Sequence, residues 1–476
     1  MTLINLDQGA ARRDTAAVSD NPFLAPVRRA LGHADDAAVT FEGDGAFASA
    51  FAVTDLAAAA IGAAGAELAA LAVPAGGEGR RGGGPPPVGV DRRLASWWFA
   101  SSMRPVGWEL PPVWDAVAGD YPTADGWIRL HTNAPHHRAA ALAVLGVAAD
   151  RETVARAVAP WCADELEAAV VATGGCAAAM RAAGDWVTHP QGAAVAAEPL
   201  IAWTDAVDAP GAMGWSPAAG RPLAGVRVLD LTRVLAGPVA TRFLAGYGAD
   251  VLRLDPPGWD EPAVTPDVTL GKRCARLDLR AADGRRCFEV LLARADVLVH
   301  GYRSDALDRL GLDEAWRRAV RPGLVDVALD AYGWTGPWRA RRGFDSLVQM
   351  SAGIAHTGMV RAGRDRPTPL PVQALDHATG YLAAAAALRG LRVRRDGGHG
   401  AAARLSLART GALLVDGPAG RLDVDLAPPA DADWSPVPER TAWGDVRRLR
   451  PAVSVAGVPQ WWDRPASPLG SHDAAW

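Results

Sequence analysis

Residues 226–255 read VRVLDLTRVLAGPVATRFLAGYGADVLRLD. Two short apolar runs, 226–231 and 249–255, flank a segment at 239–248 that has the apolar spacing of a helix and ends in glycine. Short apolar runs of this kind are typical of strands that are buried on both faces of a parallel sheet. The stretch therefore predicts a strand, a helix and a second strand.

Working outward, the same pattern continues toward the C-terminus. Further apolar runs occur at 295–300 and 324–330, and a helical pattern at 283–293 precedes the first of them. Strands that alternate with helices predict parallel βαβ units and a doubly wound sheet. We therefore expect an α/β fold in which a Rossmann-like parallel sheet domain is accompanied by a smaller α+β domain.

The first half of the chain is patterned differently. Residues 52–73 read as an alanine-rich helix with Thr54 or Asp55 as a candidate N-cap. Residues 74–87 have the composition of a flexible loop, and residues 88–99 read as a strand that runs into an apolar segment. Four regions are expected: an N-terminal helix–loop–strand unit that packs on the large domain (1–99), a small α+β domain (100–209), a Pro/Gly-rich linker (210–221), and the Rossmann-like large domain with a C-terminal tail (222–476).

One supersecondary unit occurs twice in the sequence. Residues 51–99 and 371–415 both contain an aspartate at the start of an alanine-rich helix, then a glycine-rich loop and a strand. The two aspartates are Asp55 and Asp376. Such self-similarity indicates an internal repeat.

Composition excludes several classes of protein. The net charge of −4 argues against a dedicated nucleic-acid binder, which needs a basic field. Four scattered cysteines form no CxxC pair, so neither a disulfide framework nor a zinc site is expected, and a cytoplasmic location is the simplest. The first twenty residues lack a signal-peptide pattern, and no strongly apolar run of spanning length is found, so we expect no membrane association.

Local sequence alone leaves several candidate residues open. Asp376 reads either as an N-cap or as a carboxylate nucleophile. Lys272, the single lysine, lies in a Gly-Lys-Arg turn that is either solvated or a phosphate contact, and Arg309 reads as a surface arginine. The turn at 231–238 lacks a dinucleotide fingerprint, although a helix starting at Pro238 would offer free N–H groups to an anion. Three histidines are expected to be surface or partly buried side chains: His131, His136 and His137.

Taken together, residues 222–415 resemble the family III CoA-transferases, the group of formyl-CoA transferase, carnitine CoA-transferase and α-methylacyl-CoA racemase. The motifs are PLAGVRVLDLTRVLAGPVATRFLAGYGADVLRLDPPG, LGKRCARLDLRAADG, ADVLVHGYRSDALDRLGL, AYGWTGPWRARRGFDSLVQMSAGIAHTG and ALDHATGYLAAAAALRGL, in that order. Residues 118–192 resemble the family's small domain, and PASPLGSH resembles its C-terminal tail. Because the small domain usually follows the large one, the resemblance implies a permuted order or a shortened tandem fusion.

The resemblance implies a CoA thioester as substrate, a carboxylic acid as acceptor, and no resident cofactor or metal. Asp376 matches the aspartate that forms the acyl anhydride and the aspartyl-CoA intermediate. A carboxylate can attack a thioester and expel the thiolate, and arginine suits the phosphates of CoA. The positions that match CoA contacts are Arg233, Val234, Leu235, Ala236, Lys272, Tyr302, Arg309 and Arg342. Gly397 and Gly398 are the candidate oxyanion loop.

Some positions depart from the family. Racemases of the group use the histidine of a Gly-His-Asp triplet, whereas this chain has Gly343, Phe344 and Asp345, and phenylalanine moves no proton. Gly301 and Pro256 replace an Asn and an Arg that are frequent in the family. We expect an acyl-CoA:carboxylate CoA-transferase, and the alternatives are an acyl-CoA isomerase or a non-catalytic CoA-binding subunit.

The resemblance also bears on assembly. It implies an interlocked homodimer, whereas a shortened tandem fusion would pack two half-domains within one subunit. Asp55, which lacks a preceding nucleotide-binding half, is expected to be a structural cap.

Overall fold

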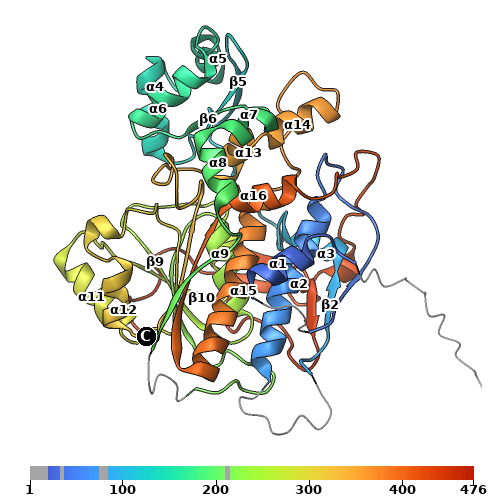
Figure 1. Cartoon of the computed structure of the whole chain (residues 1–476), viewed down its shortest axis with the longest axis vertical. Helices are drawn as coiled ribbons and strands as arrows, with labels where there is room; N and C mark the ends of the chain where they lie inside the picture. The colour runs from blue at the N-terminus through green and yellow to red at the C-terminus, as the bar shows by residue number, and fades with distance from the viewer. Residues whose placement is uncertain (1–19, 33–36, 74–83, 209–214) are drawn as a thin grey trace, which may run out of the picture.

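The computed structural model describes residues 20–32, 37–73, 84–208 and 215–476 (Figure 1). A large sheet and its helices form the lower body, and a smaller unit lies above it. The predicted loop at 74–87 and the predicted linker at 210–221 fall partly outside the described residues.

The large sheet has seven strands in the order β10-β9-β8-β11-β12-β13-β7, and only the edge strand β7 is antiparallel to its neighbour. The six parallel strands follow the doubly wound order, so the α/β fold expected from the sequence is confirmed. The direction of winding reverses between β8 and β11, which is where such sheets bind ligands. The strands are β7 (Ala202–Asp208), β8 (Arg227–Leu231), β9 (Asp250–Asp255), β10 (Lys272–Arg276), β11 (Val297–His300), β12 (Val325–Asp330) and β13 (His399–Ser406).

Helices cover both faces of this sheet, and alternate strand residues serve the two faces. Val228 belongs to the core that includes α9 (Ala236–Ala245) and α15 (Ala374–Gly397). Its neighbour Leu229 belongs to the core on the other face, beneath α11 (Ala282–Leu292) and α12 (Glu314–Val320). Burial on both faces explains why the parallel strands are apolar runs in the sequence.

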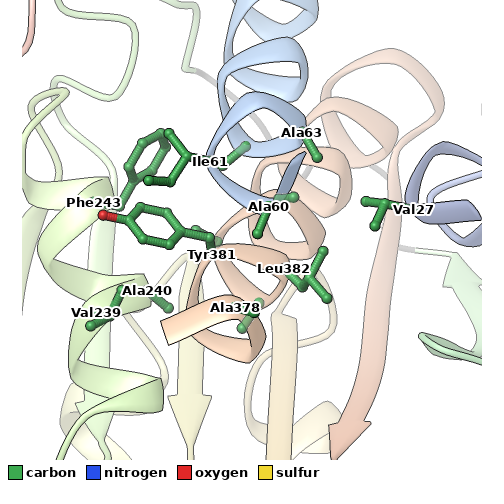
Figure 2. Close-up of a cluster of buried hydrophobic side chains, with 14 of the residues drawn as sticks. Val27, Ala60, Ile61, Ala63, Val239, Ala240, Phe243, Ala378, Tyr381 and Leu382 are labelled. Carbon is green, nitrogen blue, oxygen red and sulfur yellow. The ribbon is translucent and has the colours of Figure 1, made fainter. Parts of the chain in front are cut away.

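The alanine-rich helix α2 (Val53–Ala72) packs along α15, which itself lies against α9 (Figure 2). Small side chains such as Ala60 and Ala378 let the helix backbones approach closely, while larger side chains such as Tyr381 fill the space between them. By length and composition α2 could span a membrane, but 89% of its apolar window is buried inside the protein, as in a core helix.

The repeated sequence unit corresponds to a repeated structural unit. α2 is followed by β2 (Val88–Asp91) and α3 (Arg92–Trp98), and α15 is followed by β13 and α16 (Leu407–Val415). Residues 88–99 therefore form a strand and then a short helix, because the Asp91 side chain accepts a hydrogen bond from the Leu94 N–H and caps α3.

The C-terminal tail returns to the N-terminal unit. β16 (Val453–Val455) pairs with β2, whose other neighbour is β1 (Val39–Glu42). β15 (Gly444–Arg448) pairs with β3 (Met103–Pro105) and with β14 (Glu439–Thr441). The predicted domain boundaries at residues 99 and 222 therefore do not separate independent units, because strands from both ends of the chain form these two sheets.

The smaller unit is an antiparallel sheet of β4 (Gly119–Pro122), β5 (Trp127–Leu130) and β6 (Ala177–Ala179) with its own hydrophobic core. It differs from the predicted domain 100–209 at both ends, because β3 pairs with β15 and β7 belongs to the large sheet. The remaining helices are α1 (Leu24–Ala30), α4 (Pro135–Leu145), α5 (Arg151–Val158), α6 (Ala163–Ala172), α7 (Ala183–Thr188), α8 (Pro190–Ala197), α10 (Thr265–Val268), α13 (Asp345–Ser351) and α14 (Ile354–Arg361), with short 3-10 turns at Asp308–Leu310 and Asp431–Asp433.

Candidate active site

Asp376 lies in the first turn of α15, where its side chain lines two neighbouring cavities. The residue is only 7% exposed. The N-cap of α15 is Gln373 and makes no side-chain cap bond, so the reading of Asp376 as an N-cap is wrong. The helix therefore presents the carboxyl to the cavities instead of using it to cap its own N–H groups.

A second carboxyl lies beside the first. Asp345 begins α13, and its Oδ2 accepts a hydrogen bond of 2.9 Å from the Asp376 N–H. Burial raises the pKa of Asp345, and burial together with the charge of Asp345 raises the pKa of Asp376 well above its usual value. A carboxylate deprived of water in this way is a strong nucleophile once it is ionised, because little of its charge is dispersed by hydrogen bonds.

The first cavity, of about 320 Å³, is here called the arginine cavity. Arg233 lies over the rings of Trp259 and Tyr302, with its guanidinium carbon 4.6 and 5.1 Å from the ring centroids. Among the described residues, Arg233 and Arg342 have no ion-pair partner, and Arg342 donates a 3.3 Å hydrogen bond to the carbonyl of Gly174. Free guanidinium groups at the reversal point of a doubly wound sheet suit a phosphate-bearing ligand. The lining residues are His136, His137, Leu231, Arg233, Val234, Ala236, Trp259, Gly301, Tyr302, Arg303, Ala306, Leu329, Asp330, Ala331, Arg341, Arg342, Gly343, Phe344, Asp376 and Leu407.

The second cavity, of about 390 Å³, is here called the aromatic cavity. It shares Val234, Trp259, Phe344 and Asp376 with the arginine cavity, so Asp376 stands where the two cavities meet. Its lining residues are Pro112, Val113, Trp114, Asp115, His131, Asn133, Ala134, Val234, Leu235, Trp259, Asp260, Glu261, Pro262, Ala263, Val264, Phe344, Asp345, Ser346, Gln373 and Asp376.

The turn between β8 and α9 separates the cavities and is held by Glu261. Val234 has φ of 65°, a left-handed conformation that is costly for a β-branched residue. Its N–H donates a 2.9 Å hydrogen bond to Oε2 of Glu261, which also pairs with the buried Arg253. α9 begins at Ala236, two residues before the predicted start at Pro238, so Ala236 is the first helical residue and Leu235 the N-cap. The role of Glu261 was not predicted, because its contact with Val234 joins residues 27 positions apart in the chain.

Lys272 occupies a different position from the one predicted. Its side chain is fully buried, and Nζ donates hydrogen bonds of 2.9 Å to Oδ2 of Asp230 and to the carbonyl of Pro238. Residues 272–276 form strand β10, not a solvated turn. An ammonium group enclosed by these partners is not available to a phosphate, so the prediction of a CoA contact at Lys272 is corrected to a structural ion pair.

The buried ion pair between Lys272 and Asp230 predicts that substitution of Lys272 lowers the stability of the protein strongly. Lys272→Met leaves the Asp230 carboxylate buried without its cation, and we expect a loss of about 3–5 kcal/mol in the free energy of unfolding. Urea unfolding measures it, with Arg273→Met as the matched control, which removes a partly exposed pair with Asp250 and costs less than about 1 kcal/mol. Unchanged stability with weakened CoA binding in Lys272→Met would restore the original prediction.

Gly397 and Gly398 are also misplaced in the sequence prediction. Gly397 is the last residue of α15, and Gly398 ends the helix with φ of 70°. Asp376 lies in the first turn of the same helix, and a rise of 1.5 Å per residue separates the two ends by roughly 32 Å. These glycines terminate a helix and are not the oxyanion loop of Asp376.

Arg309 and Asp55 lie outside the two cavities. The Arg309 side chain is 70% exposed and pairs with Asp305 at 2.5 Å, so a CoA contact at this residue stays a prediction. Asp55 occupies the third position of α2, as Asp376 does in α15, but its carboxyl accepts a 2.6 Å hydrogen bond from Arg92. Since the N-cap of α2 is Ala52, neither Thr54 nor Asp55 is the N-cap, and the predicted structural cap at Asp55 is wrong.

Two of the three histidines of the smaller unit are more buried than predicted, whereas His136 is exposed as expected. His131 and His137 are buried, and His131 stacks on Phe344 with ring centroids 3.7 Å apart. Burial lowers the pKa of both imidazoles to about 3, so they are neutral. His131 lines the aromatic cavity, and His136 and His137 line the arginine cavity. Local sequence could not predict their burial, because it depends on contact with Phe344, which is far away in the sequence.

Among the described residues no group of three or more metal-ligating side chains is found.

Known proteins resemble one part of the chain. The sequence profile of CoA-transferase family III matches residues 223–422. An acyl-CoA transferase of Fusarium pseudograminearum is 30% identical over 214 residues, which cover 40% of this chain and 46% of that protein. A succinyl-CoA:glutarate CoA-transferase of Mus musculus is 34% identical over 194 residues, covering 38% and 44%.

The solved structure of Rv3272 from Mycobacterium tuberculosis is similar at 29% identity, covers 41% of this chain and 58% of that chain, and has a TM-score of 0.38. The chain spans less than half the length of these two curated relatives. Residues 223–422 of this chain are thus similar to CoA-transferase family III.

Proposed function

We propose that this chain is an acyl-CoA:carboxylate CoA-transferase that works through an aspartyl-CoA thioester on Asp376. The observation that carries the proposal is the position of the Asp376 carboxyl where the arginine cavity meets the aromatic cavity. The guanidinium groups of Arg233 and Arg342, which have no ion-pair partner among the described residues, suit the phosphates of CoA, while the aromatic cavity suits the acyl group. The names of the Fusarium and mouse relatives support the same reaction class.

The reaction consists of two exchanges at one carboxyl. A carboxylate oxygen of Asp376 attacks the thioester carbonyl carbon, the C–S bond breaks, and CoA leaves as a thiolate, which produces a mixed anhydride. The thiolate then attacks the aspartyl carbonyl carbon, and the donor acid leaves as a carboxylate. The acceptor carboxylate repeats these steps in reverse order and leaves as the new CoA thioester. No oxidant, metal or net proton is needed.

The elevated pKa of Asp376 predicts a pH dependence of this first attack. Only the ionised carboxylate is nucleophilic, so the rate of thiolate release rises with pH until Asp376 is ionised. Asp345→Asn removes the neighbouring negative charge that helps to raise the pKa of Asp376. The increase in the rate of thiolate release should therefore occur at lower pH in this variant. Single-turnover rates between pH 5 and 9 measure the shift. If the increase in rate occurs at the same pH or at higher pH in the variant, the assignment of Asp376 as the titrating group is wrong.

An acceptor-dependent assay tests the function itself. The purified chain is mixed with hexanoyl-CoA, with and without a second carboxylic acid, and the CoA thioesters are separated and quantified. The proposal predicts a new thioester of the added acid together with an equal amount of free hexanoate. Release of free CoA alone, or no reaction across a panel of acids, contradicts it and favours hydrolysis or a non-catalytic subunit.

An acyl-CoA isomerase is the second candidate, and one observation favours it. Imidazoles lie against Phe344, the residue that replaces the racemase histidine: His131 is stacked on it, and the ring of His137 is 5.8 Å away. Their pKa of about 3 makes both weak bases for an α-proton. Uptake of deuterium at the α-carbon of the acyl-CoA in D₂O would favour the isomerase.

The chain order and the assembly belong to the same proposal. We propose a permuted order relative to the family, because the small unit at 119–179 precedes the large sheet. The packing of α2 on α15 within one chain supports two half-domains in one subunit, and the homodimer implied by the resemblance is the alternative. Sedimentation of the active protein distinguishes a monomer from a dimer.

A further inference from the structure

We propose that the acyl site accepts monocarboxylic acids with an uncharged, largely apolar chain and rejects dicarboxylic acids. This inference rests on the proposed function and adds the class of acid to it. The aromatic cavity carries the argument, through the charges and the shapes of the side chains that line it.

The direction of the substrate follows from the position of Asp376. The reacting carbonyl must lie beside this carboxyl, which lines both cavities. A CoA moiety that directs its phosphates toward Arg233 and Arg342 fills the arginine cavity. The acyl chain, attached on the other side of the carbonyl, then extends into the aromatic cavity.

No lysine or arginine lines the aromatic cavity among the described residues. Its charged side chains are carboxylates instead, and apart from Asp376 they are Asp115, Asp260, Glu261 and Asp345. The one basic side chain in the lining is His131, and burial keeps its imidazole neutral. A second carboxylate on the acyl chain would therefore lose water without gaining a cation from the lining, which opposes binding.

Two arginines that contact lining residues from outside the cavity are already engaged. Arg129 lies over the ring of Trp114 at 4.6 Å and pairs with Asp120 at 2.6 Å. Arg138 pairs with Asp115 at 2.8 Å. The buried hydroxyl of Ser346 and the amide of Gln373 can donate hydrogen bonds but carry no charge that offsets the desolvation of a carboxylate.

The shape of the cavity favours a sizeable apolar chain. The aromatic side chains of Trp114, Trp259 and Phe344 line it, and the His131 ring is stacked in parallel on Phe344. The cavity of about 390 Å³ is larger than the cavity of roughly 150 Å³ that suffices for a benzene ring. Aryl and medium-length alkyl chains can fill this space and bury their surface against the rings.

Heptanoate and heptanedioate, which differ only in the second carboxyl group, test the inference, together with an aryl acid. With hexanoyl-CoA as donor, kcat/KM for 3-phenylpropanoate and for heptanoate should exceed that for heptanedioate by about 100-fold or more, in line with the cost of an unpaired buried charge. Calorimetry with the non-reacting Asp376→Asn variant provides a second readout, in which hexanoyl-CoA should bind at least about 10-fold more tightly than hexanedioyl-CoA. Equal or stronger binding and turnover of the diacids overturns the inference.

The binding measurement also separates this inference from the proposed function. If no acid is converted but hexanoyl-CoA still binds more tightly than hexanedioyl-CoA, the transferase proposal fails and the selectivity of the cavity stands. If transfer is rapid but diacids are preferred, the selectivity fails and the transferase proposal stands.

A gain-of-function variant sharpens the test. Val113 lines the aromatic cavity and is 53% exposed, so a longer side chain fits without burial. Val113→Arg should raise kcat/KM for heptanedioate relative to heptanoate by about 10-fold, because it supplies the missing cation. Val113→Gln, the neutral control, should not change the ratio. An equal gain in both variants, or a gain in neither, contradicts the electrostatic origin of the selectivity.

Discussion

Asp376→Asn is expected to lower CoA transfer by at least about 1000-fold, while the binding of CoA thioesters remains close to that of the unmodified protein. The amide has the shape of the carboxylate but cannot form the anhydride or the aspartyl thioester. The substitution also relieves the repulsion from Asp345, so the fold is not expected to suffer. Initial rates with hexanoyl-CoA and an acceptor acid measure the loss, and calorimetry measures binding.

The chain contains a matched control for this variant. Asp55 has the same place in α2, third from the start of an alanine-rich helix, but it pairs with Arg92. Asp55→Asn should keep the transfer rate and cost less than about 1 kcal/mol of stability. If Asp376→Asn retains activity, or if Asp55→Asn loses it, the assignment of the nucleophile is wrong.

The second large effect is expected at the arginine cavity. Arg233→Gln and Arg342→Gln should each raise KM for the CoA thioester by about 10- to 100-fold, because each removes a charge-assisted contact with a phosphate. The double variant should lose about 1000-fold in kcat/KM while kcat itself changes little. Steady-state kinetics at two ionic strengths measure both, and the unmodified protein should show the stronger salt dependence.

Arg309→Gln provides the comparison within the same region. This arginine is exposed and already paired with Asp305, so its loss should raise KM less than the loss of Arg342. A double variant at 233 and 342 with an unchanged KM would show that CoA does not bind in the arginine cavity.

The parallel strands other than β10 could be predicted from sequence, because their pattern is local, whereas the sequence suggested a turn at β10 and placed β7 in the small domain. Strands β8, β9, β11 and β12 are short apolar runs, and a helix precedes each of β9, β11 and β12 in the chain. The position of Asp376 came from the resemblance to a family, since a single aspartate at a helix start has no distinguishing pattern. Its place between two cavities required the structure.

The sequence predictions that the structure corrects share one physical cause, which is contact between residues that are distant in the chain. Lys272 resembled an exposed basic turn because its partner Asp230 is distant in the chain. Gly397 and Gly398 resembled a loop because the length of α15 is set by its burial against α2, α9 and the sheet. His131 is a site residue only because the smaller unit places it on Phe344. The pairing of β16 with β2 likewise joins the two ends of the chain, which no local pattern predicts.

The most direct test is the intact mass of the protein after brief mixing with hexanoyl-CoA in the absence of an acceptor acid. If Asp376 is the nucleophile, a covalent species heavier by CoA minus one water should form, be located by peptide mapping on Asp376, and disappear when an acceptor acid is added. A protein whose mass does not change, or an adduct on any other residue, would contradict catalysis by this carboxyl.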